Sequence, residues 1–428
     1  MSIALLFGLF FGLLIIGARI AIALGASTFI TLVTMTSTSP LEIAGMIFEK
    51  IDSYSLMAIP MFILAGNLLS KGSSASRIIE FAKSVVGHFP GGLPMAAIFA
   101  SIIFAAVSGS SPATVVAIGS IMFGAIEQAG YPKRYAIGTV ATAGSLGILI
   151  PPSIVLIVYG VTAEVSIGKL FMAGVIPGIM IGLMMMAVTY IGAIRLGFQK
   201  SKPQPWSVRF QKMKDASWAL MTIIIVIGGI YGGIFTPTEA AAVAAVWAFF
   251  VSMFIYRDIQ WSDLYATFLG AAKTSAMIMF IIANAMIFAH FLTLENVPHM
   301  ITQLLINAHV GPILFLVFVN ILLFFAGDFM EPSAIIMIMV PLLLPVAKAL
   351  GIDPIHFGII VTINMELGMI TPPVGLNLFV TSGITGVSLK DVIVYAWPWA
   401  SMILLGLLIV TYIPEISLWL PHLIYGES

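Results

Sequence analysis

The sequence contains no cysteine and unusually little charge. Without cysteine, the 428-residue chain offers no disulfide, no thiolate nucleophile and no cysteine ligand for zinc or an iron–sulfur cluster. Charged residues make up only 8% of the chain, against about 25% in soluble proteins. The 18 basic and 18 acidic residues balance to a net charge of zero, which argues against nucleic acid as a partner.

Hydrophobic residues take the place of the missing charge. They account for 60% of the chain, and the mean hydropathy is +1.12. A soluble core of this size cannot bury so much apolar surface, so we predict a polytopic protein of the lipid bilayer. The apolar runs are continuous and lack the alternation of a β-barrel, which indicates an all-α fold. The N-terminal run has no basic region and no A-x-A cleavage site, so we expect a span and not a removed signal peptide.

Basic residues gather in one loop near the middle of the chain. Six of the 18 basic residues lie between positions 195 and 214. By the positive-inside rule, we expect the loop 195–216 to be cytoplasmic. The six residues are Arg195, Lys200, Lys202, Arg209, Lys212 and Lys214.

The two halves that flank this loop carry the same motifs about 220 residues apart. LGILIPP at 146–152 matches LGMITPP at 367–373, and SSPA at 110–113 matches MEPS at 330–333. Weaker matches join AGYP at 129–132 to GIDP at 351–354, and TAEVS at 162–166 to ITGVS at 384–388. Repeats with breaks in matching places are typical of secondary transporters. If the repeats are inverted, the C-terminus is periplasmic, and we expect the N-terminus on the same side.

Each half contains a polar kink within an apolar run, SGSSPAT at 108–114 and GDFMEPS at 327–333. Ser111 is predicted to cap a helix whose first residue is Pro112. Glu331 and Pro332 repeat this pattern, although glutamate is a poorer cap. We therefore predict that each kink is the tip of a helical hairpin, buried in protein or lining a cavity. The free amides of such a tip attract anions, and its free carbonyls attract cations.

A second break follows each kink, AGSLGILIPP at 143–152 and NMELGMITPP at 364–373. The paired prolines lack amide hydrogens and leave upstream carbonyls without partners. Side chains of Thr142, Ser145, Asn364 and Thr371 add oxygen atoms. Oxygen ligands with few full charges suit sodium, so we predict cation sites where each tip meets a break. Proline and glycine also make simple packing kinks in membrane helices, but matched pairs favour a site.

Three acidic residues fall in the second tip and the second break, namely Asp328, Glu331 and Glu366. A charge at membrane depth costs roughly 2.5–3.5 kcal/mol or more, so such residues usually pair or line a pathway. We expect one of them to assist a cation site and the others to cap or pair. His290 and His356 are interpreted as packing residues and not as metal ligands.

Three further segments have local interpretations. Thr236, Pro237 and Glu239 have the spacing of a capping box at a helix start. Residues 74–89 and 258–273 are predicted to be amphipathic helices at the membrane interface.

An intramembrane hydrolase with a serine nucleophile at 110–111 is a remote alternative, because no nearby histidine is evident as its base. A channel is a third possible class.

Several of these motifs resemble a known family. SGSSPATVVAIGS, GTVATAGSLGILIPPSIVLIVYG, IFTPTEAAAVAAV, GDFMEPSAIIMI and GIDPIHFGIIVTINMELGMITPPVGLNLFVTS are similar to segments of the large membrane subunit of tripartite ATP-independent periplasmic (TRAP) transporters. The resemblance implies an elevator-type transporter of the bacterial inner membrane, with inverted repeats, two re-entrant hairpins and two broken transmembrane helices, and no enzyme activity. It also implies coupling to two or more sodium ions (Na+). The implied partners are a small four-helix membrane subunit and a periplasmic substrate-binding protein.

Carried over by motif, the resemblance implies one sodium site at each tip and a substrate carboxylate between the tips. Where the family often has asparagine, this chain has Asp328, whose charge and role stay open. Implied sodium ligands are Ser108, Gly109, Ser110, Ser111, Gly144, Ser145, Gly327, Asp328, Glu331, Glu366, Gly368 and Thr371. Implied substrate contacts are Ser110, Ser111, Pro112, Thr114, Pro332, Ser333, Asn377 and Thr381.

The resemblance also divides the chain and names a substrate class. The expected substrate is an organic acid of the sialic acid or C4-dicarboxylate class, and a stand-alone sodium–dicarboxylate symporter without a binding protein is the alternative. The expected segments are N-terminal scaffold helices with an amphipathic arm (1–92), a first transport half (93–172), scaffold helices with the cytoplasmic loop and a second arm (173–311), a second transport half (312–395) and a C-terminal scaffold helix (396–428).

Overall fold

The computed structural model describes residues 2–36 and 38–426, and over these residues it contains helices and no strand. Eight of the described helices are long and apolar enough to cross a membrane. The predicted all-α polytopic fold is therefore confirmed. The eight spans are Tyr54–Lys71, Ile167–Arg195, Trp206–Tyr231, Pro237–Ile255, Trp261–Leu294, Pro312–Phe329, Pro332–Ala349 and Leu389–Tyr412.

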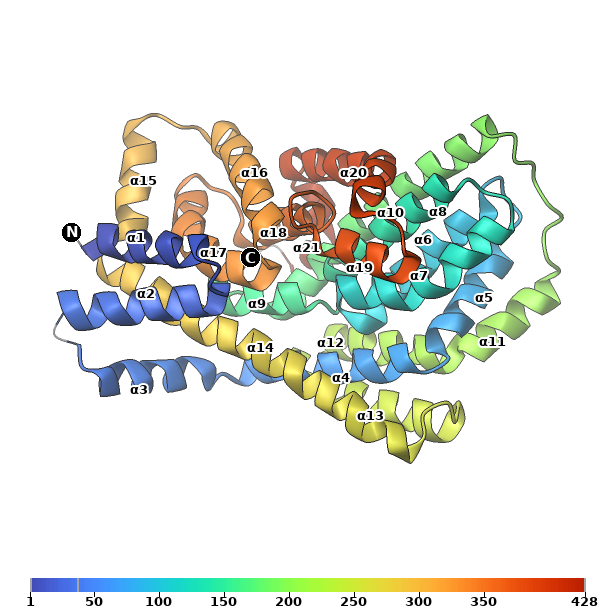
Figure 1. Cartoon of the computed structure of the whole chain (residues 1–428), viewed down its shortest axis with the longest axis horizontal. Helices are drawn as coiled ribbons and strands as arrows, with labels where there is room; N and C mark the ends of the chain where they lie inside the picture. Colours follow the sequence, from blue (N-terminus) through green and yellow to red (C-terminus); the bar gives the residue numbers. More distant parts are fainter. Residues whose placement is uncertain (1, 37, 427–428) are drawn as a thin grey trace.

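The helices form two repeats that lie in opposite orientations (Figure 1). The first repeat comprises α1 (Ser2–Ile15), α2 (Ile20–Met35), α3 (Pro40–Ile51), η1 (Tyr54–Met57), α4 (Ala58–Lys71), α5 (Ser74–Val86), α6 (Gly92–Ser108), α7 (Ser111–Gln128), α8 (Lys133–Ala143), η2 (Gly144–Ile148), α9 (Ile154–Ala163) and α10 (Ile167–Arg195). The second comprises α11 (Trp206–Ile223), η3 (Ile224–Gly228), α12 (Gly229–Tyr231), α13 (Pro237–Phe250), η4 (Val251–Ile255), α14 (Trp261–Leu294), α15 (Val297–Asn307), α16 (Pro312–Phe329), α17 (Pro332–Ala349), α18 (Pro354–Gly368), α19 (Leu376–Thr385), α20 (Leu389–Tyr412) and α21 (Glu415–Tyr425).

Each repeat contains one helical hairpin and one broken helix, as predicted. The hairpins are α6–α7 and α16–α17, and they enter from opposite ends of the molecule in Figure 1. The broken helices are α8–η2–α9 and α18–α19. Both breaks contain two consecutive prolines, with the bonds Pro151–Pro152 and Pro372–Pro373 in the cis form.

The repeats interlock through the second halves of the broken helices. Helix α9 packs against α17 of the other repeat, and α19 packs against α7. The second half of each broken helix therefore supports the opposite hairpin, while the first halves α8 and α18 pack against the hairpin of their own repeat. This exchange joins both hairpins and both broken helices into one packed unit, which holds the two polar tips in fixed relation to each other.

Other helices frame this unit. Helix α4 packs on α13, and α2 packs on α14, so corresponding pairs from the two repeats make corresponding contacts. Helix α5 packs along α6, and α15 packs along α17, so each hairpin carries one short helix on its outer side. Helix α10 packs mainly against α21, α20 and α6, and α20 packs mainly against α8, α10 and α18. The predicted boundaries at 172/173 and 395/396 stay predictions, since nothing in the structure tests which parts move together.

Helix α5 has the amphipathic character predicted for residues 74–89. Its apolar residues Ile78, Ile79 and Ala82 are buried, while Glu80 faces outward and pairs with Lys83 at 3.0 Å and with Lys212 at 3.7 Å. Partial burial tends to raise the pKa of Glu80, but the two lysines outweigh it and hold that pKa below its usual value.

Two segments differ from their predicted form. The N-terminal run, expected as one span, forms the short helices α1 and α2, because the chain turns at Gly17 with φ +85°. Residues 258–273, expected as a separate interface helix, belong mostly to α14, which continues without a break to Leu294. An amphipathic pattern does not reveal where a helix ends if no glycine, proline or cap interrupts it.

Two local predictions are confirmed. Thr236 and Glu239 form the capping box at the start of α13, with Glu239 N donating to Thr236 Oγ1 at 3.3 Å and Thr236 N donating to Glu239 Oε2 at 2.8 Å. His356 is buried, and its Nδ1 lies 2.7 Å from Ser417 Oγ, which gives it a packing partner.

Candidate functional site

The first tip joins α6 to α7 and is held together by its own hydroxyl groups. Ser108 Oγ lies 2.8 Å from Thr114 Oγ1, which donates to the carbonyl of Ser110 at 2.9 Å. Ser108 and Thr114 are buried. Thr114, predicted as a substrate contact, therefore shapes the tip from within.

The cap predicted for this tip is wrong by one residue. Helix α7 begins at Ser111, so its N-cap is Ser110, which has extended backbone (φ −138°, ψ 126°) and makes no side-chain capping bond. Pro112 consequently occupies the second helical position. The hydroxyl of Ser111 is committed elsewhere, because it accepts a hydrogen bond from Asn377 Nδ2 at 2.6 Å. The side chain of Ser110 is left without a capping role at the tip.

The second tip joins α16 to α17 and is capped by Glu331, as predicted. The carboxylate accepts from the backbone amides of Ser333 at 3.0 Å and Ala334 at 3.3 Å, and from Ser333 Oγ at 2.9 Å. Pro332 is the first residue of α17. Glu331 therefore uses its charge to satisfy free amides at the helix start. Asp328, three residues earlier, is 4% exposed and its Oδ1 has no partner.

Each tip lies directly against the break of its own repeat, at glycines in matching positions. A Cβ atom added to Gly147 would lie 2.7 Å from the carbonyl oxygen of Ser110, and one added to Gly368 would lie 2.7 Å from the backbone of Gly327. Both distances are far inside van der Waals contact, so only glycine permits the approach. The backbone carbonyls of tip and break thereby come together in both repeats.

Backbone hydrogen bonds fasten the same junctions. The amide of Ile154, just after the first pair of prolines, donates to the carbonyl of Gly109 at 3.4 Å. The amide of Val374, just after the second pair, donates to the carbonyl of Asp328 at 3.0 Å. The predicted tip residues 108–111 thus lie against the break that contains the predicted Gly144 and Ser145, and residues 327–331 lie against 366–371.

Two side-chain contacts join the repeats to each other. Ser145 Oγ lies 3.1 Å from Glu366 Oε1, although the two residues are 221 positions apart. This separation is the offset of the repeats themselves, so Ser145 and Glu366 occupy equivalent positions and meet where the repeats face each other. The bond between Asn377 and Ser111 is a second link, from the second break to the first tip. The two candidate sites therefore share a hydrogen-bonded boundary.

Several buried oxygen atoms of the second tip, the second break and α19 have no hydrogen-bond partner. Buried polar atoms are nearly always hydrogen-bonded, and exceptions often mark a water or ion site. Among the described residues near the second tip and break, the unpartnered buried oxygens are Asp328 Oδ1, Asn364 Oδ1, Glu366 Oε2, Asn377 Oδ1 and Thr381 Oγ1. Such a donor set fits a hard cation. No group of three or more His, Cys, Asp or Glu side chains suited to a metal ion occurs in the part of the chain that the structure describes.

Gly144 and Thr371, two further predicted residues, support the geometry of the tips and breaks. Gly144 meets Val115 of α7, so that a Cβ there would clash with that side chain. Thr371 Oγ1 donates to the carbonyl of Leu367 at 2.5 Å, one turn earlier.

Asn320 on α16 is a polar residue that sequence reasoning missed. Its Nδ2 donates to Thr411 Oγ1 at 3.1 Å, and its Oδ1 accepts from Asn364 Nδ2 at 2.8 Å. A lone asparagine within VFVNILLFF was the available signal. Asn320 links the second break to α20 and so fixes Asn364.

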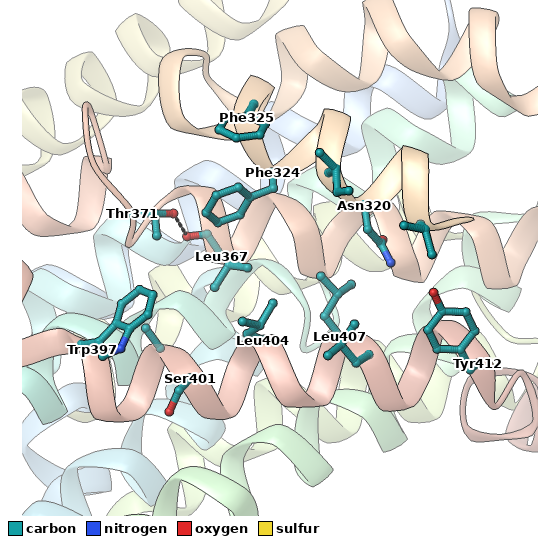
Figure 2. A pocket seen from close by; sticks show the side chains of 14 residues that line it. Asn320, Phe324, Phe325, Leu367, Thr371, Trp397, Ser401, Leu404, Leu407 and Tyr412 are labelled. Atoms are coloured by element: carbon teal, nitrogen blue, oxygen red, sulfur yellow. Dashed lines mark hydrogen bonds between the residues drawn. The ribbon is translucent and has the colours of Figure 1, made fainter. Parts of the chain in front are cut away.

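A groove beside Asn320 is not the candidate substrate site. It has a volume of about 290 Å³ between α16 and α20. Figure 2 shows Phe324, Leu404 and Leu407 facing into it, with Thr371 at one end. The lining is mainly apolar and carries only scattered polar groups such as Ser401 and Tyr412, whereas the tips bring several amides and hydroxyls together.

The comparison with known proteins decides the family. A family model described as the DctM component of the tripartite ATP-independent periplasmic transporter matches residues 7–416. The chain belongs to this family. It is therefore a multi-pass transporter permease of the inner membrane and not an enzyme, so the hydrolase alternative is wrong. TRAP large permeases work with a small membrane subunit and a periplasmic binding protein.

The chain is similar in sequence to two permeases from Vibrio cholerae and similar in fold to one solved structure. The C4-dicarboxylate TRAP transporter large permease protein is 48% identical, covering 100% of this chain and 99% of the relative. The sialic acid TRAP transporter large permease protein is 33% identical, covering 97% of each. The crystal structure of the YdaH transporter from Alcanivorax borkumensis has a TM-score of 0.63 at 16% identity, covering 98% of this chain and 99% of that chain. That last likeness concerns the fold alone.

Proposed function

We propose that this TRAP permease imports a C4-dicarboxylate together with two or more sodium ions, after receiving it from a periplasmic binding protein. The observation that carries the proposal is the paired arrangement of tip and break. In each repeat, the hairpin tip packs directly against a helix break that contains two consecutive prolines. Buried oxygen atoms without hydrogen-bond partners occur in the second tip and break. Sodium enters this account as a co-transported substrate.

We assign one cation site to each tip and break. At the first, the carbonyls and hydroxyls of 108–111 and 144–145 would surround one ion. At the second, Gly327, Asp328 and the break 366–371 would surround another. The contact between Ser145 and Glu366 joins the two sites, so filling one would position ligands of the other. This linkage explains how sodium binding would be cooperative.

The tips would also hold the anionic substrate. Hairpin tips present free amides at the starts of α7 and α17, and helix starts attract anions. Glu331 already occupies the amides of Ser333 and Ala334. The first tip has no such internal anion, since Ser110 makes no capping bond. We therefore expect a substrate carboxylate to use the amides and hydroxyls of the first tip, with Asn377 and Thr381 beside it.

The substrate class follows from the relatives. The permease named for C4-dicarboxylates shares more identity with this chain than the one named for sialic acid in the same organism, 48% against 33%. Since both relatives come from one species, the difference does not reflect distance between organisms. We therefore favour a C4-dicarboxylate over sialic acid.

The interlocked packing favours an elevator mechanism. Hairpins and broken helices cross between repeats, α9 on α17 and α19 on α7, and so would move as one body. The frame formed by α2, α4, α13 and α14 would stay fixed. The basic loop 195–216 is expected on the cytoplasmic side. Ser2, at the start of α1, lies at the end of α14, where its Oγ donates to Glu295 Oε2 at 2.7 Å, and we expect this side to be periplasmic.

Uptake by reconstituted vesicles tests the proposal. The chain is incorporated with its small subunit, purified binding protein is added outside, and labelled succinate or sialic acid is supplied with or without an inward sodium gradient. We expect succinate uptake that needs both sodium and binding protein. Uptake without the binding protein would favour a stand-alone symporter, and uptake without sodium would remove the coupling. Preferred uptake of sialic acid would overturn the substrate assignment alone.

A further inference from the structure

A second hollow lies at the opposite end of the molecule from α15, where α8, α10 and α20 meet (Figure 1). Its volume is about 470 Å³. One part of its lining is basic, with Arg134 at the start of α8 and Arg195 at the end of α10. Another part is apolar, with Val188, Ile191 and Val394 among its residues. The hollow therefore joins a cationic end to a hydrocarbon-like wall, and the transport mechanism above makes no use of it.

Hydrogen bonds and an aromatic contact join the three helices behind this hollow. The Tyr135 hydroxyl donates to the carbonyl of Thr189, and Trp399 Nε1 donates to Thr189 Oγ1 at 2.7 Å. The rings of Tyr135 and Trp399 meet edge to face with centroids 5.1 Å apart. These contacts tie α8, α10 and α20 together and leave the hollow preformed. A preformed cavity binds a ligand at a smaller entropic cost than one that must first open.

The two arginines at the rim have no acidic partner. Both side chains are exposed, and among the described residues neither forms an ion pair. Asp391, the acidic residue in the first turn of α20, does not line the hollow, and its Oδ2 accepts from the hydroxyl of Ser388 at 2.7 Å. Two unpaired guanidinium groups on one rim favour a phosphate, which they bind through several charge-assisted hydrogen bonds.

The position of the rim matches the headgroup level of one membrane leaflet. Arg195 opens the basic loop 195–216, and Tyr131, beside the start of α8, stacks on Phe198 of that loop with centroids 3.9 Å apart. Arg134 and Arg195 thus lie at the loop end of the spans, which the positive-inside rule assigns to the cytoplasm. Tyr395 and Trp399 add aromatic rings, which prefer the same level.

We infer that this hollow binds an anionic phospholipid of the cytoplasmic leaflet. Its phosphate lies between Arg134 and Arg195, and one acyl chain follows Val188, Ile191 and Val394. Basic pockets between transmembrane helices on the cytoplasmic side are suited to anionic headgroups. A free organic acid would satisfy the arginines but would leave the apolar wall unused. The lipid would bridge three helices, including α8, which leads directly to Ser145 in the first candidate site.

Lipid titration of the full-length chain in detergent tests this inference without measuring transport, so its outcome is independent of the proposed function. Phosphatidylglycerol, phosphatidylcholine and inorganic phosphate are added separately, and bound lipid and melting temperature are measured by native mass spectrometry and a thermal shift assay. We expect phosphatidylglycerol to bind and to raise the melting temperature, and the other two to do neither. Protection by phosphate as strong as that by phosphatidylglycerol would overturn the lipid assignment.

Matched variants locate the site. R134Q/R195Q should bind phosphatidylglycerol about thirtyfold more weakly, from about 1 kcal/mol for each basic residue removed. K200Q/K202Q removes the same charge from the same end of the molecule but leaves the lining intact, and its affinity should change by less than about threefold. Val394→Trp keeps both arginines and fills the hollow, so it should also lose binding. Wild-type affinity in R134Q/R195Q or Val394→Trp, or equal loss in K200Q/K202Q, would contradict the assignment.

Discussion

The contact between Gly368 and Gly327 allows one added methyl group to test the second cation site. A Cβ atom at position 368 would lie 2.7 Å from the backbone carbons of Gly327, whereas ordinary contact begins near 3.4 Å. In Gly368→Ala the tip and the break must therefore separate by the difference between these distances, about 0.7 Å. Gly368 is buried and Gly327 partly buried, and the atoms that would meet are backbone on both sides, so this separation cannot be absorbed by a flexible side chain.

A displacement of this size is large for a cation site. Metal–ligand distances vary by only about 0.2 Å in a working site, so the variant should lose at least one good ligand. We expect the sodium concentration for half-maximal uptake to rise at least about tenfold, equivalent to about 1.4 kcal/mol of binding free energy. Overpacking costs roughly 1–3 kcal/mol of stability, so the protein should remain folded.

The assay is succinate uptake in reconstituted vesicles as a function of sodium concentration, with folding checked by size-exclusion chromatography. Gly383→Ala is the matched control, because a Cβ atom there would meet nothing within 4 Å. Gly147→Ala should weaken sodium binding like Gly368→Ala, since its Cβ would press on the first tip. An unchanged sodium curve in Gly368→Ala would refute the placement of a cation at this junction.

Three further outcomes follow from the structure. Ser145→Ala removes the hydroxyl that contacts the buried Glu366 carboxyl group at 3.1 Å and should lower stability by about 1–3 kcal/mol, seen as a lower melting temperature. Ser275→Ala, which loses only a bond to its own helix, should change the melting temperature less. Ser110→Ala should raise the sodium requirement of uptake, and an unchanged requirement would exclude that hydroxyl from the site. The lowered pKa of Glu80 means that its ion pairs stabilise the fold above the pKa of the unfolded chain and stop doing so as the pH falls through the lower, folded-state pKa. In Glu80→Gln the melting temperature should therefore fall less steeply as the pH is lowered. The effect should be small, because half-exposed ion pairs contribute well under about 1 kcal/mol to stability.

Much of the fold could be predicted because polar residues, glycine and proline interrupt long apolar runs. The tips at 108–114 and 327–333 and the breaks at 143–152 and 364–373 are breaks in hydrophobic helices, and their repetition identified both repeats. The cap at Ser110 was missed by one residue, because Ser110 and Ser111 are chemically identical candidates before Pro112. The choice between them depended on Asn377, which is distant in sequence and takes the hydroxyl of Ser111.

The contacts that complete the site could not be predicted. Ser145 and Glu366 are aligned by the repeat offset, but alignment of repeats does not imply contact, which depends on how the inverted halves pack. Asn320 carried only a weak signal, one polar residue in an apolar run. The continuity of α14 was missed for a related reason: an amphipathic stretch and an apolar stretch can belong to one helix when no residue between them stops it.

The central claim is that two joined cation sites drive import, and the sodium dependence of succinate uptake tests it most directly. The measurement uses vesicles that contain the chain with its small subunit, in the presence of binding protein and at fixed membrane potential. Two sites linked through Ser145 and Glu366 predict a sigmoidal curve with a Hill coefficient above one, which should fall toward one in Ser145→Ala. A hyperbolic curve for the unaltered protein, or uptake that does not depend on sodium, would contradict the account.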